Sequence, residues 1–191
     1  MKHFLKNILG VHEKELIETI IGISGMKHCT KGQRLYTQGD VVDTCSFLVS
    51  GVVGAFIYTK GGKQIADSFS FEPGEMITPL TGDGKKALTS VYAMTEADIF
   101  IISNHDMESL YKNYPAFHRV ILSWLMRAYH KQWELKNARY QMTAKGRILF
   151  FLERYHGLEG VLSDRHLASF LDMSPETLSR QKRSLREEKP D

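Results

Sequence analysis

The chain has 191 residues, enough for one large domain or two small ones that each bury a hydrophobic core. No apolar run is long enough to cross a bilayer, and the first ten residues are too short and too polar for a signal peptide. With only Cys29 and Cys45, these features lead us to expect a cytoplasmic protein without a membrane partner. The net charge of +3 is slight, so any surface that attracts nucleic acid must be local.

The first half of the chain predicts a helix followed by strands. Apolar residues recur at helical spacing within residues 3–27, among them Leu16, Ile17 and Ile20. From residue 26 to 103, short β-rich runs alternate with turn signals, and the expected strands are 46–49, 52–58, 64–70, 88–94 and 98–102. Gly61-Gly62 is the expected hairpin tip, and strands spaced this closely indicate a sandwich or barrel.

Two helices follow the strands. Asn104 is expected to cap a helix that ends near Asn113, and Pro115 to open a long one that ends near Gln141. Along the long helix, residues recur every three or four positions as in a coiled coil: Ile121, Leu125, Ala128, Gln132 and Leu135. This stripe could pack on the chain's own strands. We favour a dimer interface, because the helix is longer than a small β domain could cover.

The C-terminal region predicts a helix-turn-helix. Thr143 is expected to cap a helix from Ala144 to about Tyr155. Ser163 precedes a short apolar-periodic segment, and Ser174-Pro175 is a typical start for the helix after it. Two short helices joined by a turn of a few residues form the unit that places its second helix in the DNA major groove.

The last predicted helix carries the side chains of a base reader. Arg180 is our first choice for a base contact, and the candidates for neighbouring bases are Glu176, Thr177 and Arg183. The candidates for phosphate contacts are Ser163, Ser174, Lys182 and Arg186, and Ser179 adds a hydroxyl near the start of the helix. The alternative is an ordinary helical hairpin with a solvated basic face.

Two regions of the sequence, each with three short motifs, resemble the Crp/Fnr family of bacterial transcription regulators. In the helix-turn-helix these are Leu167-Ala168, Leu171-Asp172-Met173-Ser174 and Thr177-Leu178-Ser179-Arg180, with Asp172 where the family usually has glycine. The glycine landmarks of the family's cyclic-nucleotide-binding β-roll resemble residues 47–53, Gly62-Lys63-Gln64 and Pro73-Gly74-Glu75. Asp tolerates a left-handed backbone better than most residues, so its place at the turn is a mild departure.

The resemblance implies an α+β fold with three parts. These are an antiparallel β-roll sensor domain over residues 1–114, a long dimerisation helix over 115–142 and a helix-turn-helix domain over 143–191. It also implies a homodimer on a palindromic operator in double-stranded DNA, with RNA polymerase as a further partner. Family members usually continue into a β-hairpin wing, whereas this sequence ends in Glu187-Glu188-Lys189-Pro190-Asp191. We therefore expect a domain that lacks a full wing.

The resemblance also indicates where an effector would bind. In the family a glutamate holds the ribose of cyclic AMP, and an arginine with an adjacent serine holds the phosphate. The glutamate is present as Glu75, but the other two positions fall on Ala87 and Leu88, with Lys85 and Lys86 beside them. Lysine cannot reproduce the bidentate fork of arginine. The positions that would meet the base fall on Gln132 and Trp133. We therefore expect no response to cyclic AMP, and either an unidentified small-molecule effector or none. A second reading makes Glu75 a turn residue.

Other chemistries find less support. An iron–sulfur cluster needs four cysteine ligands, and this chain has two. Haem sensing stays open, since His105, His118 and His130 lie near the roll and the long helix, although a lone histidine is far more often an ordinary surface or core residue. A metal-dependent enzyme on the cupin pattern would need histidines on its strands, and none lies between Cys29 and Ser103, so we expect no catalytic residues and no metal ligands. A remaining alternative is a dimeric sensor that acts through protein contacts without DNA.

Overall fold

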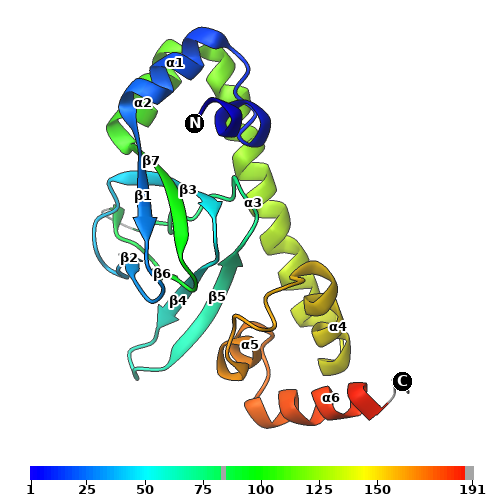
Figure 1. The fold of residues 1–191 in the computed structure, drawn as a ribbon. Coiled ribbons are helices and arrows are strands. Elements are labelled where there is room, and N and C mark those ends of the chain that lie inside the picture. Colours follow the sequence, from blue (N-terminus) through cyan, green and yellow to red (C-terminus); the bar gives the residue numbers. More distant parts are fainter. Residues whose placement is uncertain (83–84, 188–191) are drawn as a thin grey trace.

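The computed structural model describes residues 1–82 and 85–187, and a long helix, α3 (Pro115–Gln141), runs through its length (Figure 1). At one end α3 meets two N-terminal helices, η1 (Phe4–Ile8) and α1 (Lys14–Ile23), and α2 (Asn104–Asn113). At the other end it meets α4 (Ala144–Arg154), α5 (Asp164–Phe170) and α6 (Pro175–Glu187). Of the predicted acidic tail, residues 188–191 lie outside the described part of the chain.

The strands form two antiparallel sheets beside α3. One sheet has the order β1-β7-β3, made of Ser24–Cys29, Ala97–Ser103 and Thr44–Ser50. The other has the order β2-β6-β4-β5, made of Arg34–Tyr36, Ser90–Ala93, Val53–Tyr58 and Gln64–Ser70. The predicted α+β class with antiparallel strands is confirmed. The hairpin tip also falls at the predicted place, since Gly62 has φ +77° and Thr59 N–H donates to the Lys63 carbonyl at 3.0 Å.

The prediction of a helix over residues 3–27 is wrong in two places. The first turns form a short π-helix that ends before Gly10, where φ is +76°. The chain then turns again after Ile23, because Ser24–Cys29 pairs with the edge of β7, with Gly25 opposite Ile101. Strand β1 was missed because its sequence, SGMKHC, has no β-branched or aromatic residue. Backbone hydrogen bonds to β7 stabilise this strand although its residues have a low β propensity.

Side chains on the two faces of the strands pack into separate hydrophobic cores. On β3 and β7, Leu48 and Ile99 point between the two sheets, where they meet Val53, Ile77 and Val91. Phe47 and Phe100 point the other way, against the N-terminal helices and α3, whose Trp124 donates its indole N–H to the Leu9 carbonyl at 2.8 Å. The N-terminal segment is therefore part of the fold.

A third core joins the second sheet to the C-terminal helices. Its buried members from the roll are Phe56, Ala66 and Phe69 of the strands and Val52, which precedes β4. Those from α4, α5 and α6 include Phe151, Phe170 and Leu178, and α3 contributes Leu135. The aromatic rings of Phe69 and Phe170 are 5.0 Å apart, and the Ala66 N–H donates to Ser169 Oγ at 3.0 Å. Helix α5 thus packs directly on β5, an edge strand of its sheet.

The residues at the N-termini of α2, α3 and α4 agree with prediction in two cases out of three. Thr143 Oγ1 accepts from the Gly146 N–H, and Pro115 occupies the first position of α3, both as predicted. At α2 the predicted cap is wrong by one residue. The Ser103 hydroxyl accepts from the Asp106 N–H at 3.0 Å, while Asn104 donates its amide to the Val42 carbonyl and ties α2 to the roll.

Candidate nucleic-acid interface and sensor site

Helices α5 and α6 form the helix-turn-helix unit. The hydroxyl of Ser163 accepts from the His166 N–H at 3.2 Å, and that of Ser174 from the Thr177 N–H at 3.1 Å, so both predicted caps are present. Between the helices, Asp172 has φ +52°, the left-handed conformation that the turn requires. Leu178 is fully buried beneath α6 and fixes which face of that helix points outward.

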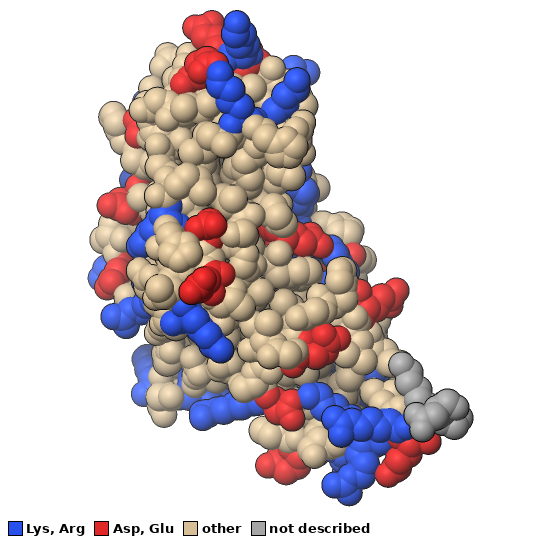
Figure 2. All heavy atoms as spheres, viewed as in Figure 1, with Lys and Arg blue, Asp and Glu red and all other residues tan. Residues whose placement is uncertain are grey.

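The outward face of α6 carries four of the predicted DNA-contact residues. Glu176, Ser179, Arg180 and Arg183 recur three and four positions apart and line a shallow hollow that begins at Pro175. The pKa of Glu176 lies below its usual range, because its carboxylate hydrogen-bonds its own backbone N–H and the Ser174 hydroxyl. Figure 2 shows Lys and Arg side chains along the end of the molecule where α6 lies, interspersed with Asp and Glu.

The remaining DNA-contact candidates differ in their surroundings. Arg186 is exposed near the end of α6. Lys182 is half-buried and pairs with Asp164 at the start of α5, so it already bridges the two helices. Thr177 is half-buried, and its hydroxyl accepts from Ser174 at 3.2 Å. Thr177 and Lys182 therefore already make contacts that stabilise the helix-turn-helix unit itself.

The predicted dimer stripe on α3 divides between two faces. Leu135 is only 2% exposed and belongs to the core shared with the C-terminal helices, so its assignment to a dimer interface is wrong. Ile121 packs against the N-terminal core and Ala128 is half-buried, whereas Leu125 and Gln132 are exposed. Covered and exposed members alternate along the stripe, so the boundary between the covered and the exposed side of α3 runs along it.

An apolar face of α3 is exposed on the side opposite the roll. Its large side chains are between 50% and 80% exposed: Leu122, Leu125, Met126, Tyr129 and Trp133 follow one another at helical spacing, and Tyr140 lies about two turns further on. In Figure 1 the described elements leave the middle of α3 uncovered on the side that faces away from the strands, between the N-terminal helices and α4. Sequence reasoning missed most of these residues, because Tyr and Met suit either a core or an interface.

Glu75 is held by the protein itself. It follows the turn at Gly74, where φ is +88° and an added Cβ would lie 2.5 Å from Ile8. One carboxylate oxygen accepts from the backbone N–H groups of Phe71 and Glu72 at 2.7 and 3.1 Å. The other pairs with Lys131 of α3. The turn reading of Glu75 is therefore correct, and Lys131 is a partner that the sequence did not reveal.

The other predicted effector residues do not gather around Glu75. Ala87 is buried, and its backbone pairs with the loop at residues 39–40, while Leu88, Lys85 and Lys86 are exposed on the roll. Gln132 and Trp133 are exposed on α3.

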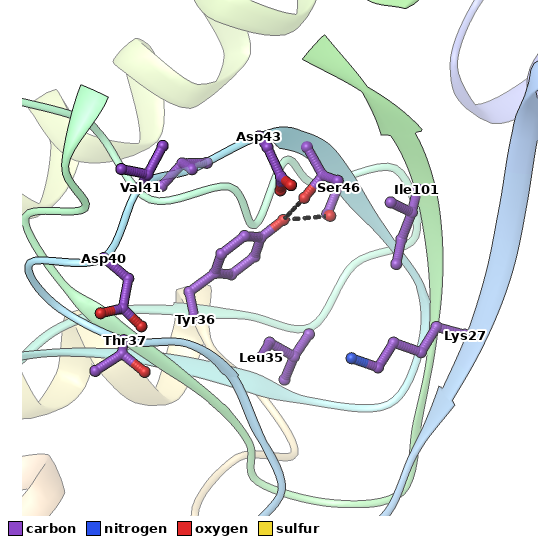
Figure 3. A pocket seen from close by; sticks show the side chains of 11 residues that line it. Lys27, Leu35, Tyr36, Thr37, Asp40, Val41, Asp43, Ser46 and Ile101 are labelled. Atoms are coloured by element: carbon purple, nitrogen blue, oxygen red, sulfur yellow. Dashed lines mark hydrogen bonds between the residues drawn. The ribbon is translucent and has the colours of Figure 1, made fainter. Parts of the chain in front are cut away.

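A cavity of about 290 Å³ lies elsewhere, at the end of the roll where β2 meets β3 (Figure 3). Its lining includes Lys27, Asp40 and Asp43, and at its wall the Tyr36 hydroxyl bonds Ser46 and Thr44 at 2.5 and 3.0 Å. Burial raises the pKa of Tyr36. None of the predicted effector residues is among the described residues that line this cavity.

Two further searches covered the described residues. Over residues 1–82 and 85–187, no group of three or more His, Cys, Asp and Glu side chains is arranged to hold a metal ion. In the same part of the chain, no helix has the length and hydropathy needed to span a membrane.

Comparison with known proteins identifies the roll and the overall fold. Residues 26–114 match the family described as the cyclic nucleotide-binding domain. No curated protein sequence matches the chain.

Three solved structures illustrate the similarity of fold. FixK2 from Bradyrhizobium japonicum is 16% identical, with 87% of this chain and 86% of that chain covered and a TM-score of 0.73. The c-di-GMP responsive global regulator CLP from Xanthomonas campestris is 15% identical, with 92% and 93% covered and a TM-score of 0.73. A protein from Eubacterium rectale assigned to the transcriptional regulators of the Crp/Fnr family is 16% identical, with 96% and 87% covered and a TM-score of 0.73. The resemblance to Crp/Fnr regulators is thus confirmed at the level of the fold.

Proposed function

We propose that this chain, which combines a cyclic nucleotide-binding domain with the fold of Crp/Fnr regulators, is a sequence-specific DNA-binding transcription regulator. The observation that carries the proposal is the outward face of α6. There Glu176, Ser179, Arg180 and Arg183 stand together on a helix whose opposite side is anchored by Leu178. Guanidinium groups on such a face suit guanine edges and phosphates in the major groove. The protein then acts by binding, and the proposal gives it no catalytic step.

The functional unit is a homodimer joined along α3. The exposed apolar face from Leu122 to Tyr140 supports this assembly, because an isolated helix face of that size rarely stays in water. Two copies related by a two-fold axis present two α6 helices to DNA. Their half-sites would lie about 34–36 Å apart, one helical turn, and the operator would be palindromic.

The regulator does not depend on cyclic AMP. Both oxygens of Glu75 are already bound within the chain. From Thr78 to Thr89 the sequence has no arginine to compensate a buried phosphate. Any effector of the roll would therefore be recognised by other groups.

Selection from random duplex DNA with the full-length protein tests this function. The selection has three arms. The first contains no nucleotide, the second contains cyclic AMP, and the third contains cyclic di-GMP, to which the Xanthomonas protein responds. We expect a two-fold palindrome to be enriched without nucleotide. Enrichment with cyclic AMP alone would contradict our reading of the roll. Absence of enrichment in every arm would favour a dimeric sensor that acts through protein contacts.

A further inference from the structure

Lys131 lies at a junction of the roll, the long helix and the DNA-binding helices. From α3 its ammonium group pairs with Glu75 and donates to the Phe69 carbonyl at the end of β5, at 2.9 Å. The same ammonium lies 4.9 Å from the centre of the Phe71 ring and 5.4 Å from that of Tyr155, the residue that ends α4. The side chains of Lys131 and Glu75 are 18% and 15% exposed.

These contacts compensate the burial of both charges. The ammonium has two hydrogen-bond acceptors and two aromatic faces, and the Glu75 oxygen that does not contact Lys131 accepts from two backbone N–H groups. Burial raises the pKa of Tyr155, and the neighbouring Glu75 charge raises it further. A ligand that used Glu75 would have to displace Lys131 and leave its charge without a counter-ion.

We propose that Lys131 is an internal tether that takes the place of an effector at Glu75 and holds the helix-turn-helix unit on the roll without any ligand. This inference rests on the proposed function, because it describes how the DNA-binding helices are positioned. Its basis is the location of one largely covered cation between Glu75, which follows the turn at Gly74, and Tyr155, the residue that follows α4.

The effect of the tether reaches the interface between α5 and β5 through Tyr155. The Tyr155 ring packs edge-on against Phe170, with centroids 5.1 Å apart, and Phe170 packs against Phe69 of β5. Arg139 of α3 supports the same point, since it donates twice to the Phe170 carbonyl, at 2.9 and 2.7 Å. Ser169, next to Phe170, accepts the Ala66 N–H. Ala66 therefore reports whether α5 is docked.

The test is hydrogen exchange at single amides in full-length Lys131→Met. Methionine keeps the apolar stem of the side chain and removes the charge. Because a hydrogen bond to a charged group contributes more than a neutral one, we expect the Ala66 amide to exchange about tenfold faster. The amide of Phe100, in the central strand β7, should keep its rate. The matched control is Lys112→Met, which breaks the exposed Lys112–Glu108 pair and should change neither amide.

The outcomes separate the tether from general stability and from DNA binding. An unchanged Ala66 rate in Lys131→Met would overturn the proposal, as would equal acceleration at Ala66 and Phe100. If the methionine variant does not fold, Lys131→Gln gives the same comparison with a polar side chain. The measurement contains no DNA, so it holds whether or not the selection experiment finds an operator.

Discussion

Arg180 is the residue on which the proposed base contact depends most. It occupies the middle of the outward face of α6, between Glu176 and Arg183. Replacing it with alanine should weaken operator binding by about 1–3 kcal/mol and relax the preference at one base of each half-site, because a bidentate contact to guanine is lost. Binding titrations on the selected operator and its single-base variants measure both effects.

The matched control for Arg180→Ala is Arg119→Ala. Arg119 is exposed near the start of α3, far along the molecule from α6, and its loss removes the same charge. The control should bind as the unaltered protein does. If Arg180→Ala kept full affinity and the same base preference, the assignment of Arg180 would be wrong.

Asp172 tests the turn between α5 and α6. At φ +52° a side chain with a branched Cβ is strained, whereas glycine is not. We expect Asp172→Gly to leave the free energy of unfolding nearly unchanged, because relief of strain is offset by the greater freedom of the unfolded chain. Asp172→Val should lower it by about 1–2 kcal/mol. Denaturant titration measures the free energy of unfolding of both variants. Equal values would mean that the turn does not require a left-handed backbone at residue 172.

His166 should make the docking of α5 sensitive to acid. Its ring packs 5.0 Å from Phe56, and its Nδ1 is buried without a hydrogen-bond partner among the described residues. Burial lowers the pKa of His166, and the nearby Arg165 lowers it further. The folded state therefore binds this proton less well than the unfolded state does. The contribution of neutral His166 to the free energy of unfolding is therefore fully present above about pH 6.5, and it decreases as the pH drops below that value.

The measurement for His166 is the melting temperature from pH 5 to 8, with His166→Gln for comparison. The unaltered protein should lose more stability than the variant between pH 6.5 and 5. Parallel curves for the two proteins would show that His166 does not titrate on folding.

At the level of elements, helix α3 shows what periodicity can predict and what it cannot. The bounds Pro115–Gln141 agree with those read from the sequence, because proline marks the start and helical spacing continues to the end. Which residues face a partner could not be read in the same way. The helix has two apolar faces, one around Trp124 and Leu135 and one around Tyr129, and only the packed roll shows which is already covered.

The roll and the turn before Glu75 show a second limit of prediction from sequence. Strand β5 agrees with its predicted bounds because residues 64–70 lie between clear turn signals, whereas β1 has no such signal. The pairing of Glu75 with Lys131 joins residues 56 positions apart. No local pattern marks such a pair, so the effector residues inferred from the resemblance could not reveal that Glu75 is already occupied.

The exposed face of α3 leads to a prediction about assembly. Tyr129→Glu places a carboxylate at the centre of the proposed interface and should convert a dimer to a monomer, since burying two unpaired charges is costly. The fold should survive, because Tyr129 is largely exposed in the single chain. Sedimentation velocity measures the mass. Ser123→Glu, on an exposed polar flank of α3, should stay dimeric. A dimeric Tyr129→Glu protein would place the interface elsewhere.

For the molecule as a whole, the core shared by the roll and the C-terminal helices leads us to expect one cooperative unit. Phe170 is fully buried between Phe69 of β5, Tyr155 and Phe151, so neither half completes its core without the other. Calorimetry of the intact chain should therefore show one unfolding transition. Phe170→Ala should lower the stability of that transition by about 3–5 kcal/mol, from lost burial and the cavity left behind.

Leu152→Ala is the matched control for Phe170→Ala, because Leu152 is exposed on α4 and its truncation leaves the shared core intact. Its transition should stay close to that of the unaltered protein. Two transitions in the intact chain, with Phe170→Ala shifting only one of them, would show that the halves fold independently. One shifted transition would mean that the roll and the C-terminal helices unfold together, since α5 cannot leave β5 without exposing Phe69, Phe170 and the backbone of an edge strand.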